Sequence, residues 1–584
     1  MAADPSNAQI ADALQELGDL YELDGAIVHR VVAYRSAAKA VREASVSVAA
    51  RAREGRASEL PGIGKTLQEK ILALAETGTI PAAERLRAKF PPGLIALTRL
   101  PGLGPKRARL LYSELGVDSP EALREAAEGQ RLRSVKGLGP KFEQSMLAAL
   151  ERAGQQPPDG GGRVLLPRAM QIGEALVAGL LDGAGEDARV ELAGSIRRRA
   201  DSVKDIDIVA VTDDPAALLE RLGGLEEIER VSSSGSAGAR ARTHAGVGVD
   251  LRIAAPGALG SLLQHFTGSG AHNTALREAA VRRGLHVSEY GILDDATGET
   301  EPFATERDVY ARLGLAYIEP ELRENRGELA AAADGTLPRL IELADIRGDL
   351  HSHTIASDGH YTIEEMGRAA RELGHEYLAI TDHSASHGFG NAVSAEQLER
   401  QIELVAEANE RVDGIELLAG SEVNILPDGS LDYDDELLAR LDWVIASVHT
   451  SFGASEQAMT ERMITAIEHP LVRAIGHPTG RKIEQRDPYA LDLEAVFAAA
   501  ARAGTMLEIN ANPDRRDLSD VHARAAARAG VQILIDSDAH RTDTLGNMRW
   551  GIATARRAWL SADQVANTRP WSKLRRKRRP RPAK

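Results

Sequence analysis

The carboxyl-terminal third of the chain repeats one pattern of hydrophobic and polar positions. Short apolar runs, such as Tyr377–Ile380 and Trp443–Val448, end at a His, Asp or Glu and alternate with Ala-, Glu- and Arg-rich stretches of helical length. This pattern predicts strands alternating with helices, which close most simply as a parallel β/α barrel. Active sites in such barrels lie where the strands end.

The residues at these run ends are types that bind metal ions. A lone histidine there would usually be structural or merely exposed, but several in register are better explained by a common site. A catalytic zinc usually has three protein ligands and a water, so a larger set favours two or three ions bridged by carboxylates. The side chains expected to converge on one rim are His351, His353, Asp358, His383, Glu422, His449, His477, Asp538 and His540.

The motifs HSHT, SDG, TDHS, GSEVNI, SVHT, GHPTG and SDAH over residues 346–570 resemble those of the PHP phosphoesterase family, in the family's order. The resemblance implies a distorted (β/α)7 barrel that hydrolyses phosphate esters. It also implies two or three metal ions (Mn²⁺, Zn²⁺ or Fe), with all nine ligand positions filled by ligand-type residues.

The region before residue 154 has a helical pattern, and one glycine motif occurs in it three times: LPGIGK at 60–65, LPGLGPK at 100–106 and VKGLGPK at 135–141. The glycines permit a tight turn that exposes backbone N–H groups at the next helix, where a phosphate can bind. We interpret these as helix-hairpin-helix motifs that position DNA without reading its sequence. The alternative is a plain turn between packed helices. The candidate DNA-binding residues are Gly62, Gly64, Lys65, Gly102, Gly104, Lys106, Gly137, Gly139 and Lys141.

Three carboxylates mark a second candidate centre in the middle of the chain. Asp205 and Asp207 are one residue apart in a strand-like run, so both project from the same face of a sheet. Asp250, in a later alternating strand, can supply a third carboxylate from a neighbouring strand. Such oxygen donors suit Mg²⁺ or Mn²⁺ held together with substrate phosphates. An isolated DxD would also fit a solvated edge strand.

Upstream of these carboxylates, Gly194 and Ser195 offer a close backbone approach and a hydroxyl. Arg198 adds a guanidinium that can bind a triphosphate. Together, the motifs GSxRR, DxD and VDLR indicate a site for metal ions and a triphosphate far more specifically than any one of them alone.

With these motifs, residues 1–325 resemble the family X DNA polymerases, and the whole chain resembles their bacterial PolX group, in which that core is fused to a PHP domain. The resemblance implies that Phe266, Gly268 and Asn273 bind the nucleotide and that Arg277 lies on the DNA side. His265 stands where family members commonly have an aromatic residue, so discrimination against ribonucleotides is in doubt. The loop 232–239 is also less basic than in the relatives.

Lys70 matches the lysine that forms a Schiff base in the 5′-deoxyribose phosphate lyases of this family. A lysine amine attacks a sugar aldehyde when its surroundings lower its pKa. The alternatives are an exposed helix lysine or one that only binds phosphate. Thr66 stands where a helping lysine is often found, so lyase activity is a secondary expectation.

The expected organisation is multidomain, since 584 residues exceed a single core. It comprises helical domains with helix-hairpin-helix motifs, an α+β nucleotidyltransferase palm and a nucleotide-selecting part, then the barrel. The boundaries are a lyase-like domain at 1–92, a DNA-binding subdomain at 93–156, the palm at 163–255, the nucleotide-selecting subdomain at 256–320, a linker at 321–345, the barrel at 346–570 and a basic tail at 571–584.

Composition narrows the setting. The chain has no cysteine. Hydrophobic residues make up 43% of it, but no apolar run approaches the ~18 residues that span a membrane. No signal peptide is visible, and we expect a monomeric protein of the bacterial cytoplasm. The net charge of −15 argues against binding nucleic acid over the whole surface but allows local basic grooves. The basic tail is either a DNA-binding arm or simply solvated.

The expected function is therefore a DNA polymerase that fills short gaps in repair, acting on gapped or primed DNA with dNTPs. The barrel would act as a 3′–5′ exonuclease or phosphoesterase, with cleavage at abasic sites as a further activity. Two alternatives stay open. The polymerase half could be an inactive scaffold that delivers a nuclease, or the barrel could hydrolyse a small phosphate ester.

Overall fold

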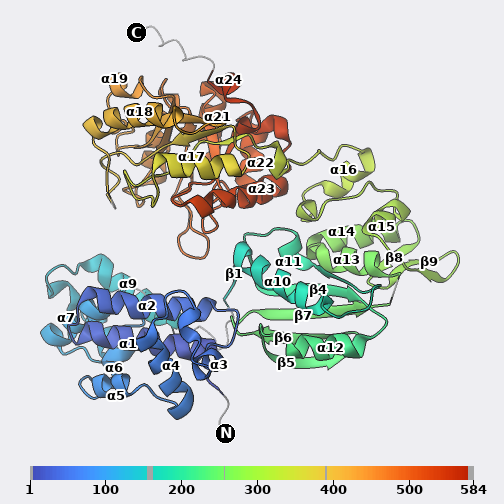
Figure 1. Ribbon diagram of the computed structural model, residues 1–584, viewed down its shortest axis with the longest axis horizontal. Coiled ribbons are helices and arrows are strands. Elements are labelled where there is room, and N and C mark those ends of the chain that lie inside the picture. The colour runs from blue at the N-terminus through green and yellow to red at the C-terminus, as the bar shows by residue number, and fades with distance from the viewer. Residues whose placement is uncertain (1–3, 101, 154–161, 256, 389–390, 576–584) are drawn as a thin grey trace. The chain divides into compact units, whose positions relative to one another are not determined.

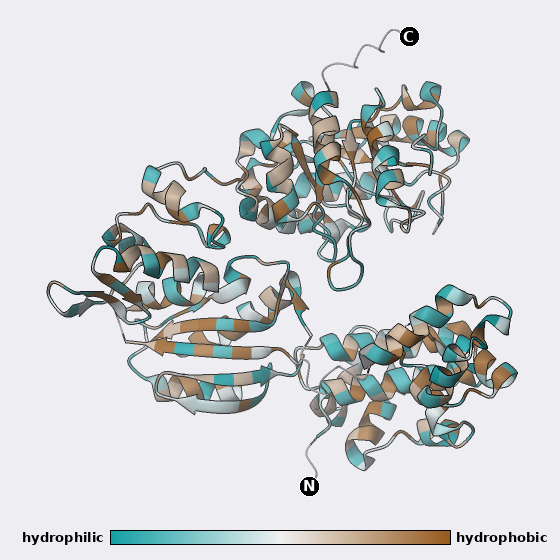
Figure 2. Ribbon diagram, turned by 180° about the vertical axis from the view of Figure 1, so that it is seen from behind, coloured by the Kyte–Doolittle hydropathy of each residue, from teal (hydrophilic) through white to brown (hydrophobic). Residues whose placement is uncertain are grey.

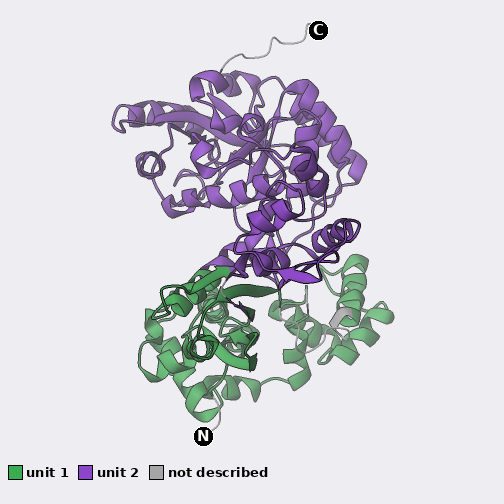
Figure 3. Ribbon diagram, turned by 90° about the vertical axis from the view of Figure 1, so that its right-hand side faces the viewer, with its two compact units in different colours: residues 1–162, 172–191, 204–253 green, residues 163–171, 192–203, 254–584 purple. Residues whose placement is uncertain are grey.

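The computed structural model describes residues 4–100, 102–153, 162–255, 257–388 and 391–575. The chain divides into two compact units (Figure 3), the first comprising residues 1–162, 172–191 and 204–253, the second residues 163–171, 192–203 and 254–584. The linker expected after Ala153 lies outside the described residues up to position 161. Residues 576–584 of the basic tail and Pro101 of the second glycine motif also lie outside them.

The amino-terminal part of unit 1 is helical, as its sequence pattern predicts (Figure 1). Apolar residues at helical spacing form two cores, one around Ile10, Leu14 and Ile71 and the other around Leu97 and Leu111. The helices are α1 (Asn7–Leu23), α2 (Val28–Glu43), α3 (Val48–Arg53), α4 (Lys65–Thr77), α5 (Pro81–Arg87), α6 (Pro92–Leu97), α7 (Pro105–Leu115), α8 (Pro120–Glu128) and α9 (Pro140–Ala153).

Each glycine motif forms a tight turn before a helix. The first glycine of each has a left-handed backbone, with φ of 80° at Gly62, 84° at Gly102 and 89° at Gly137. Residues with a side chain avoid this conformation, which is why glycine is needed there. The second glycine, Gly64 or Gly104, is the N-cap of the helix that follows, α4 or α7.

The second part of unit 1 is a five-stranded sheet with the strand order β2-β4-β7-β6-β5, which we call the palm sheet. Buried Ile206 and Ile208 alternate with partly buried aspartates in the first half of β4, and Val249 and Leu251 alternate with partly buried positions along β7. Hydrophobic and hydrophilic residues are interspersed along the strands of this sheet (Figure 2). Its strands are β2 (Arg189–Leu192), β4 (Asp205–Val211), β5 (Ile228–Gly235), β6 (Gly238–Thr243) and β7 (Gly248–Ala254), with the helices α10 (Leu166–Leu181) and α12 (Pro215–Gly224).

The first elements of unit 2 are short: β1 (Val164–Leu165), paired with β3 (Ser202–Val203), and α11 (Gly194–Arg197). A small α+β subdomain follows. Its elements are α13 (Leu259–Thr267), α14 (Gly270–Val281), β8 (Leu285–Ser288), β9 (Gly291–Asp294), β10 (Glu299–Glu301), α15 (Glu306–Arg312) and α16 (Glu328–Asp334).

The segment 321–345, which we expected to be a linker, forms regular structure and packs into a hydrophobic core. It contains α16, and Leu322, Ala332 and Leu340 lie in the same hydrophobic core as α14 and α15. Their burial explains the difference, because these apolar residues extend the preceding subdomain instead of crossing solvent.

The rest of unit 2 is a barrel of seven parallel strands in sequential order. The strands are β11 (Gly348–Asp349), β12 (Tyr377–Ile380), β13 (Glu416–Asn424), β14 (Trp443–Ser447), β15 (Ala474–Ile475), β16 (Met506–Asn510) and β17 (Ile533–Asp536). The helices are α17 (Ile363–Glu372), α18 (Ala395–Asn409), α19 (Asp435–Leu438), α20 (Glu456–Glu468), α21 (Leu493–Ala503), α22 (Asp520–Arg528), α23 (Met548–Arg557) and α24 (Trp571–Leu574).

Every residue of β12, β14, β16 and β17 is buried, as expected of parallel strands covered on both faces. A parallel bridge between Ser352 and Ala539, just beyond β11 and β17, brings the first and last strands together. The barrel is therefore nearly closed, and the predicted multidomain fold class is confirmed. Within the described residues, no helix is long and apolar enough to span a bilayer.

Candidate functional site

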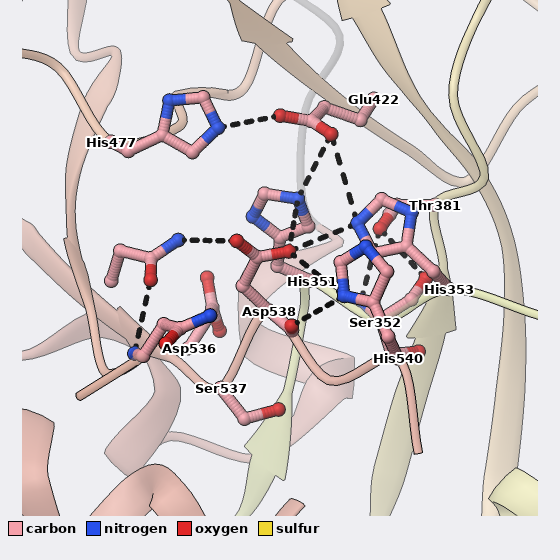
Figure 4. Close-up of polar contacts among 12 residues, drawn as sticks. His351, Ser352, His353, Thr381, Glu422, His477, Asp536, Ser537, Asp538 and His540 are labelled. Atoms are coloured by element: carbon pink, nitrogen blue, oxygen red, sulfur yellow. Dashed lines mark hydrogen bonds and ion pairs between the residues drawn. The ribbon is translucent and has the colours of Figure 1, made fainter. Parts of the chain in front are cut away.

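The nine predicted ligands of the barrel lie together at the carboxyl ends of its strands, and Figure 4 shows six of them. Each strand except β16 contributes, because an apolar strand in a parallel barrel ends at the same rim as its neighbours. All nine side chains are buried or largely buried.

Glu422, near the carboxyl end of β13, is central to this cluster. Its Oε2 lies 2.8 Å from Nδ1 of His383 and 3.4 Å from Nε2 of His351. Its Oε1 lies 2.9 Å from Nε2 of His477 and 3.3 Å from Nε2 of His449 (Figure 4). One carboxylate thus faces imidazoles from four other strand ends, which is the arrangement a bridging ligand requires.

Two aspartates of the cluster also contact more than one histidine each. Oδ1 of Asp538 lies 3.1 Å from Nε2 of His353 and 3.7 Å from Nδ1 of His540. Oδ1 of Asp358 lies 3.2 Å from Nε2 of His540 and 3.6 Å from Nε2 of His383.

The donor atoms form three compact groups that overlap through shared histidines. The groups are His353, Asp358, His383 and His540; His351, His353 and Asp538; and His383, Glu422 and His449. His477 adjoins the third group through its contact with Glu422.

The charge states fit cation binding. Burial alone would raise the pKa of Glu422, but His449, His383 and His351 outweigh it and hold the pKa well below its usual range. Burial and neighbouring imidazoles lower the pKa of His353 to about 3, and burial with Arg515 lowers that of His477 to about 3. An ionised carboxylate and neutral imidazoles are the forms that bind metals. Burial alone would lower the pKa of His351, His383 and His540, but neighbouring carboxylates outweigh it and raise these pKa values, that of His540 to about 9. These three imidazoles would therefore give up a proton when a cation binds.

Unsatisfied polar atoms support the same reading. Nε2 of His351, both ring nitrogens of His353 and both oxygens of Glu422 are buried and make no hydrogen bond within the described residues. Burying such atoms without a hydrogen bond is costly. The residues present therefore fit metal ions.

A residue that the sequence reasoning missed supports the ligands. Glu508 on β16 accepts a hydrogen bond from Nδ1 of His351 at 2.7 Å and one from the backbone N–H of His477. Asn510, two residues on, donates to Asp538 at 3.0 Å. The apolar run Met506–Asn510 followed the same pattern as the others, so its carboxylate could have been found by extending the search to every run.

A cavity of about 480 Å³ opens over the cluster. Beside the metal-ligand candidates it is lined by Phe452, Lys482, Arg486, Asn512 and Arg515. Cations next to a metal site suit an anionic ester, since they can neutralise phosphate oxygens.

The second candidate centre, in unit 1, has the geometry that its alternation predicts. Asp205 and Asp207 occupy the non-buried positions of β4, and Asp250 occupies one on β7, its neighbour in the palm sheet. Asp250 forms ion pairs with Arg252 at 2.8 Å and Arg240 at 3.6 Å.

The predicted nucleotide-binding residues Gly194, Ser195 and Arg198 belong to unit 2, in and just after α11. Gly194 has a φ of 59°, which explains the glycine. Nε of Arg198 donates to Glu324 at 3.0 Å and Nη1 donates to the carbonyl of Thr267 at 2.8 Å. This guanidinium is therefore held in one orientation.

The other predicted nucleotide residues lie around the end of α13. Asn273 accepts a hydrogen bond from Gln264 and donates to the carbonyls of His265 and Gly268, so its amide holds the backbone there. A side chain at Gly268 would clash with Asn273, since its Cβ would lie 2.5 Å from Oδ1. Phe266 is partly buried beside His265, with ring centroids 4.9 Å apart.

The DNA-side candidates are accessible. Arg277 is exposed and lies 3.3 Å from Nδ1 of His265. Lys65, Lys106 and Lys141 are exposed at the starts of their helices, and Lys70 is partly buried on α4.

Comparisons with known proteins extend this picture. The chain matches a helix-hairpin-helix domain over residues 5–80, a SAM-like helix-hairpin-helix tandem over 94–152, a DNA polymerase beta thumb over 262–324 and a PHP domain over 349–512. It is 38% identical to the DNA polymerase/3′-5′ exonuclease PolX of Bacillus subtilis (strain 168), over 95% of this chain and 96% of that protein.

Shorter relatives match as well. Probable phosphatases of Thermoanaerobacter sp. (strain X514) and Shewanella sediminis (strain HAW-EB3) are 34% and 33% identical. Each similarity covers 38% of this chain and 89% of the relative.

Proposed function

The chain belongs to the family of the DNA polymerase/3′-5′ exonuclease PolX, and on that basis we propose that it fills short gaps in DNA during repair and trims 3′ ends with its barrel. The observation that carries this proposal is the presence of two separate candidate metal centres in one chain. Three carboxylates lie on neighbouring strands of the palm sheet, and nine metal-ligand candidates lie at the barrel rim.

In the palm, Asp205 and Asp207 would hold two divalent cations, Mg²⁺ or Mn²⁺, and Asp250 would share one of them. Bound there, such ions lower the pKa of a primer 3′-hydroxyl and stabilise the departing pyrophosphate. Asp250 would accept the proton of that hydroxyl. Because it is paired with Arg252, that arginine must share or release the carboxylate.

Arg198 and Ser195 would bind the triphosphate, and Phe266 would pack under the sugar. Asn273 would support this pocket by holding the backbone at the end of α13, in addition to any contact with the base. His265 in place of an aromatic residue makes sugar discrimination the part of this proposal most in need of measurement.

In the barrel, the nine ligands would hold two or three cations, Mn²⁺, Zn²⁺ or Fe. Such ions supply a hydroxide at neutral pH and polarise the scissile phosphate. Lys482, Arg486 and Arg515 would bind the phosphodiester next to them. The helix-hairpin-helix turns would grip the DNA backbone through exposed N–H groups and lysines.

The test is a gel assay with a 5′-labelled primer on one-nucleotide-gapped DNA and Mn²⁺, with and without dNTPs. We expect Asp205→Ala to lose extension alone and His351→Ala to lose shortening alone. Asp213→Ala, which is exposed beyond the end of β4, and His469→Ala, paired with Asp435 away from the ligand cluster, serve as matched controls. Shortening without any extension by the wild-type protein would leave a nuclease on an inactive scaffold.

The relatives named probable phosphatases favour testing a small substrate as well. We expect gapped DNA to inhibit hydrolysis of a small aromatic phosphate ester by the barrel, because both substrates compete for one cavity. Undiminished ester hydrolysis at saturating DNA would favour a small-molecule phosphatase.

Lys70 would be the nucleophile of a 5′-deoxyribose phosphate lyase activity and would form a Schiff base with the sugar. Borohydride should trap the wild-type protein on an incised abasic site, and Lys70→Ala should lose this cross-link. Lys39→Ala, an exposed lysine of the same domain, should keep it. Equal trapping of both variants would remove this activity from the proposal.

A further inference from the structure

The turn that follows α11, residues 198–201, is held by the barrel. Arg516, in the loop after β16, is fully buried and donates to two carbonyls of this turn, with Nη1 3.1 Å from the oxygen of Ala200 and Nη2 3.0 Å from that of Arg199. Nη1 also lies 3.1 Å from Oδ1 of Asp201. One guanidinium thus satisfies two backbone acceptors and a carboxylate.

Two further side chains of the barrel reach the same turn. Nη1 of Arg481 lies 2.8 Å from Oδ2 of Asp201. Glu484 accepts a hydrogen bond at 2.9 Å from Ser202, the next residue along the chain. The contact is therefore built from both sides of Asp201.

The guanidinium of Arg198 is tied to the barrel through Glu324. The carboxylate of Glu324 accepts from Nε of Arg198 at 3.0 Å and from Nη1 of Arg557 at 2.9 Å. Arg557, on α23, also donates to the backbone carbonyl of Arg198 at 2.7 Å, and its other partner is Asp520 at 3.1 Å.

These contacts hold the backbone of the turn 198–201 and pair its buried charges. Arg199 has a φ of 58°, a conformation that a residue with a side chain adopts only when its surroundings hold it there. Burial lowers the pKa of Arg516 to about 10, against the attraction of Asp201, so the side chain is still cationic at neutral pH. A buried cation that loses its partner is strongly unfavourable, which makes the turn and the barrel dependent on each other.

We propose that Arg516 of the barrel is a positioning residue for nucleotide binding, acting through the turn 198–201 and the guanidinium of Arg198. The inference rests on the proposed role of Arg198 in triphosphate binding. A guanidinium already fixed in orientation loses little freedom when it meets a phosphate, so affinity for the dNTP depends on the barrel. The phosphoesterase domain is then also a part of the polymerase.

The experiment uses the full-length protein and single-nucleotide gap filling. The variants are Asp201→Asn, Arg516→Lys and the double variant, with Arg198→Ala as the reference for loss of the guanidinium. Arg502→Ala, which removes an exposed arginine of α21 that lies 3.5 Å from Glu468, is the matched control. The readouts are KM for the dNTP, kcat, the phosphoesterase rate and the melting temperature.

We expect Asp201→Asn and Arg516→Lys each to raise KM for the dNTP about tenfold, with kcat and the phosphoesterase rate within about twofold of wild type. The double variant should raise KM by less than the product of the two single effects, since both substitutions disrupt the contact between Arg516 and Asp201. The control should match wild type in every readout.

A merely structural contact would lower the melting temperature and leave KM unchanged, and that result would overturn the inference. Independent, additive effects of the two substitutions would overturn it as well. If Arg198→Ala itself leaves KM unchanged, the proposed nucleotide-binding role of Arg198 is wrong. If Arg198→Ala raises KM while Asp201→Asn and Arg516→Lys do not, that role stands and the inference alone fails.

Discussion

Individual side chains differ in how much of the barrel centre depends on them, and Glu422 is the extreme case. Its two oxygens face histidines from four strand ends. Removing its charge takes the common anion away from several imidazoles at once. Removing a single histidine leaves the carboxylates in place.

We therefore predict that Glu422→Gln, which keeps the shape but not the charge, lowers phosphoesterase activity at least about 100-fold and reduces the bound metal. Gap filling should stay within about twofold, because the palm carboxylates belong to another unit. Metal analysis of the purified protein and the gel assay measure these effects. Full metal content with full activity would contradict a bridging role.

Glu508 would support the metal ligands without binding a cation itself. Its bonds to His351 and to the backbone of His477 orient two ligands without adding one. We predict that Glu508→Gln weakens metal affinity roughly 10- to 100-fold, with activity restored by excess metal. Activity measured against Mn²⁺ concentration separates this outcome from the loss in Glu422→Gln, which excess metal should not restore.

Among the elements, the glycine turns show how backbone conformation prepares a binding surface. Gly137 and Gly139 lie in the same turn, and a Cβ at either would meet nothing within 4 Å. They differ in backbone conformation. Gly137 is left-handed, with a φ of 89°, whereas Gly139 is not. Since neither alanine would be crowded, a difference between the two variants measures the backbone strain at Gly137.

We predict that Gly137→Ala costs about 1–2 kcal/mol of folding stability and weakens binding of gapped DNA, because alanine is strained in the left-handed region. Gly139→Ala should leave stability within about 0.5 kcal/mol of wild type. Chemical denaturation and fluorescence anisotropy with labelled DNA provide the two measurements. Equal loss of stability in both variants would show that strain at Gly137 is not the cause.

Across the whole molecule, ionic contacts join parts of unit 2 that are far apart in sequence. Burial alone would raise the pKa of Glu324 and of Asp520, but Arg557 and a second arginine near each carboxylate outweigh it, so both pKa values are lowered. A carboxylate with a lowered folded pKa contributes stability above its unfolded pKa, near 4. That contribution is lost as the pH falls below it.

We predict that the wild-type melting temperature falls between pH 7 and pH 3.5 by more than that of Glu324→Gln. The variant should be less stable at pH 7, and the two proteins should converge in acid, because Gln has no charge to lose. Calorimetry across this range is the measurement. Parallel curves would mean that Glu324 contributes no pH-dependent stability.

The local pattern of the chain determined the strands of the barrel, the ligand types at their ends, the glycine turns and the shared face of Asp205 and Asp207. These features depend on period, chain direction and residue chemistry, which are local properties. The same reasoning passed over Glu508, whose role appears only because β16 lies next to β15 and faces His351. It also treated 321–345 as a linker, since a short apolar segment does not reveal which core it completes.

Only the tertiary structure decided how distant segments act together. It made Glu422 the shared neighbour of five histidines, and it placed Arg516 and Arg557 on the turn that carries Arg198. No spacing along the chain announces a contact between residues more than 300 positions apart, because such a contact arises from packing and from the pairing of buried charges.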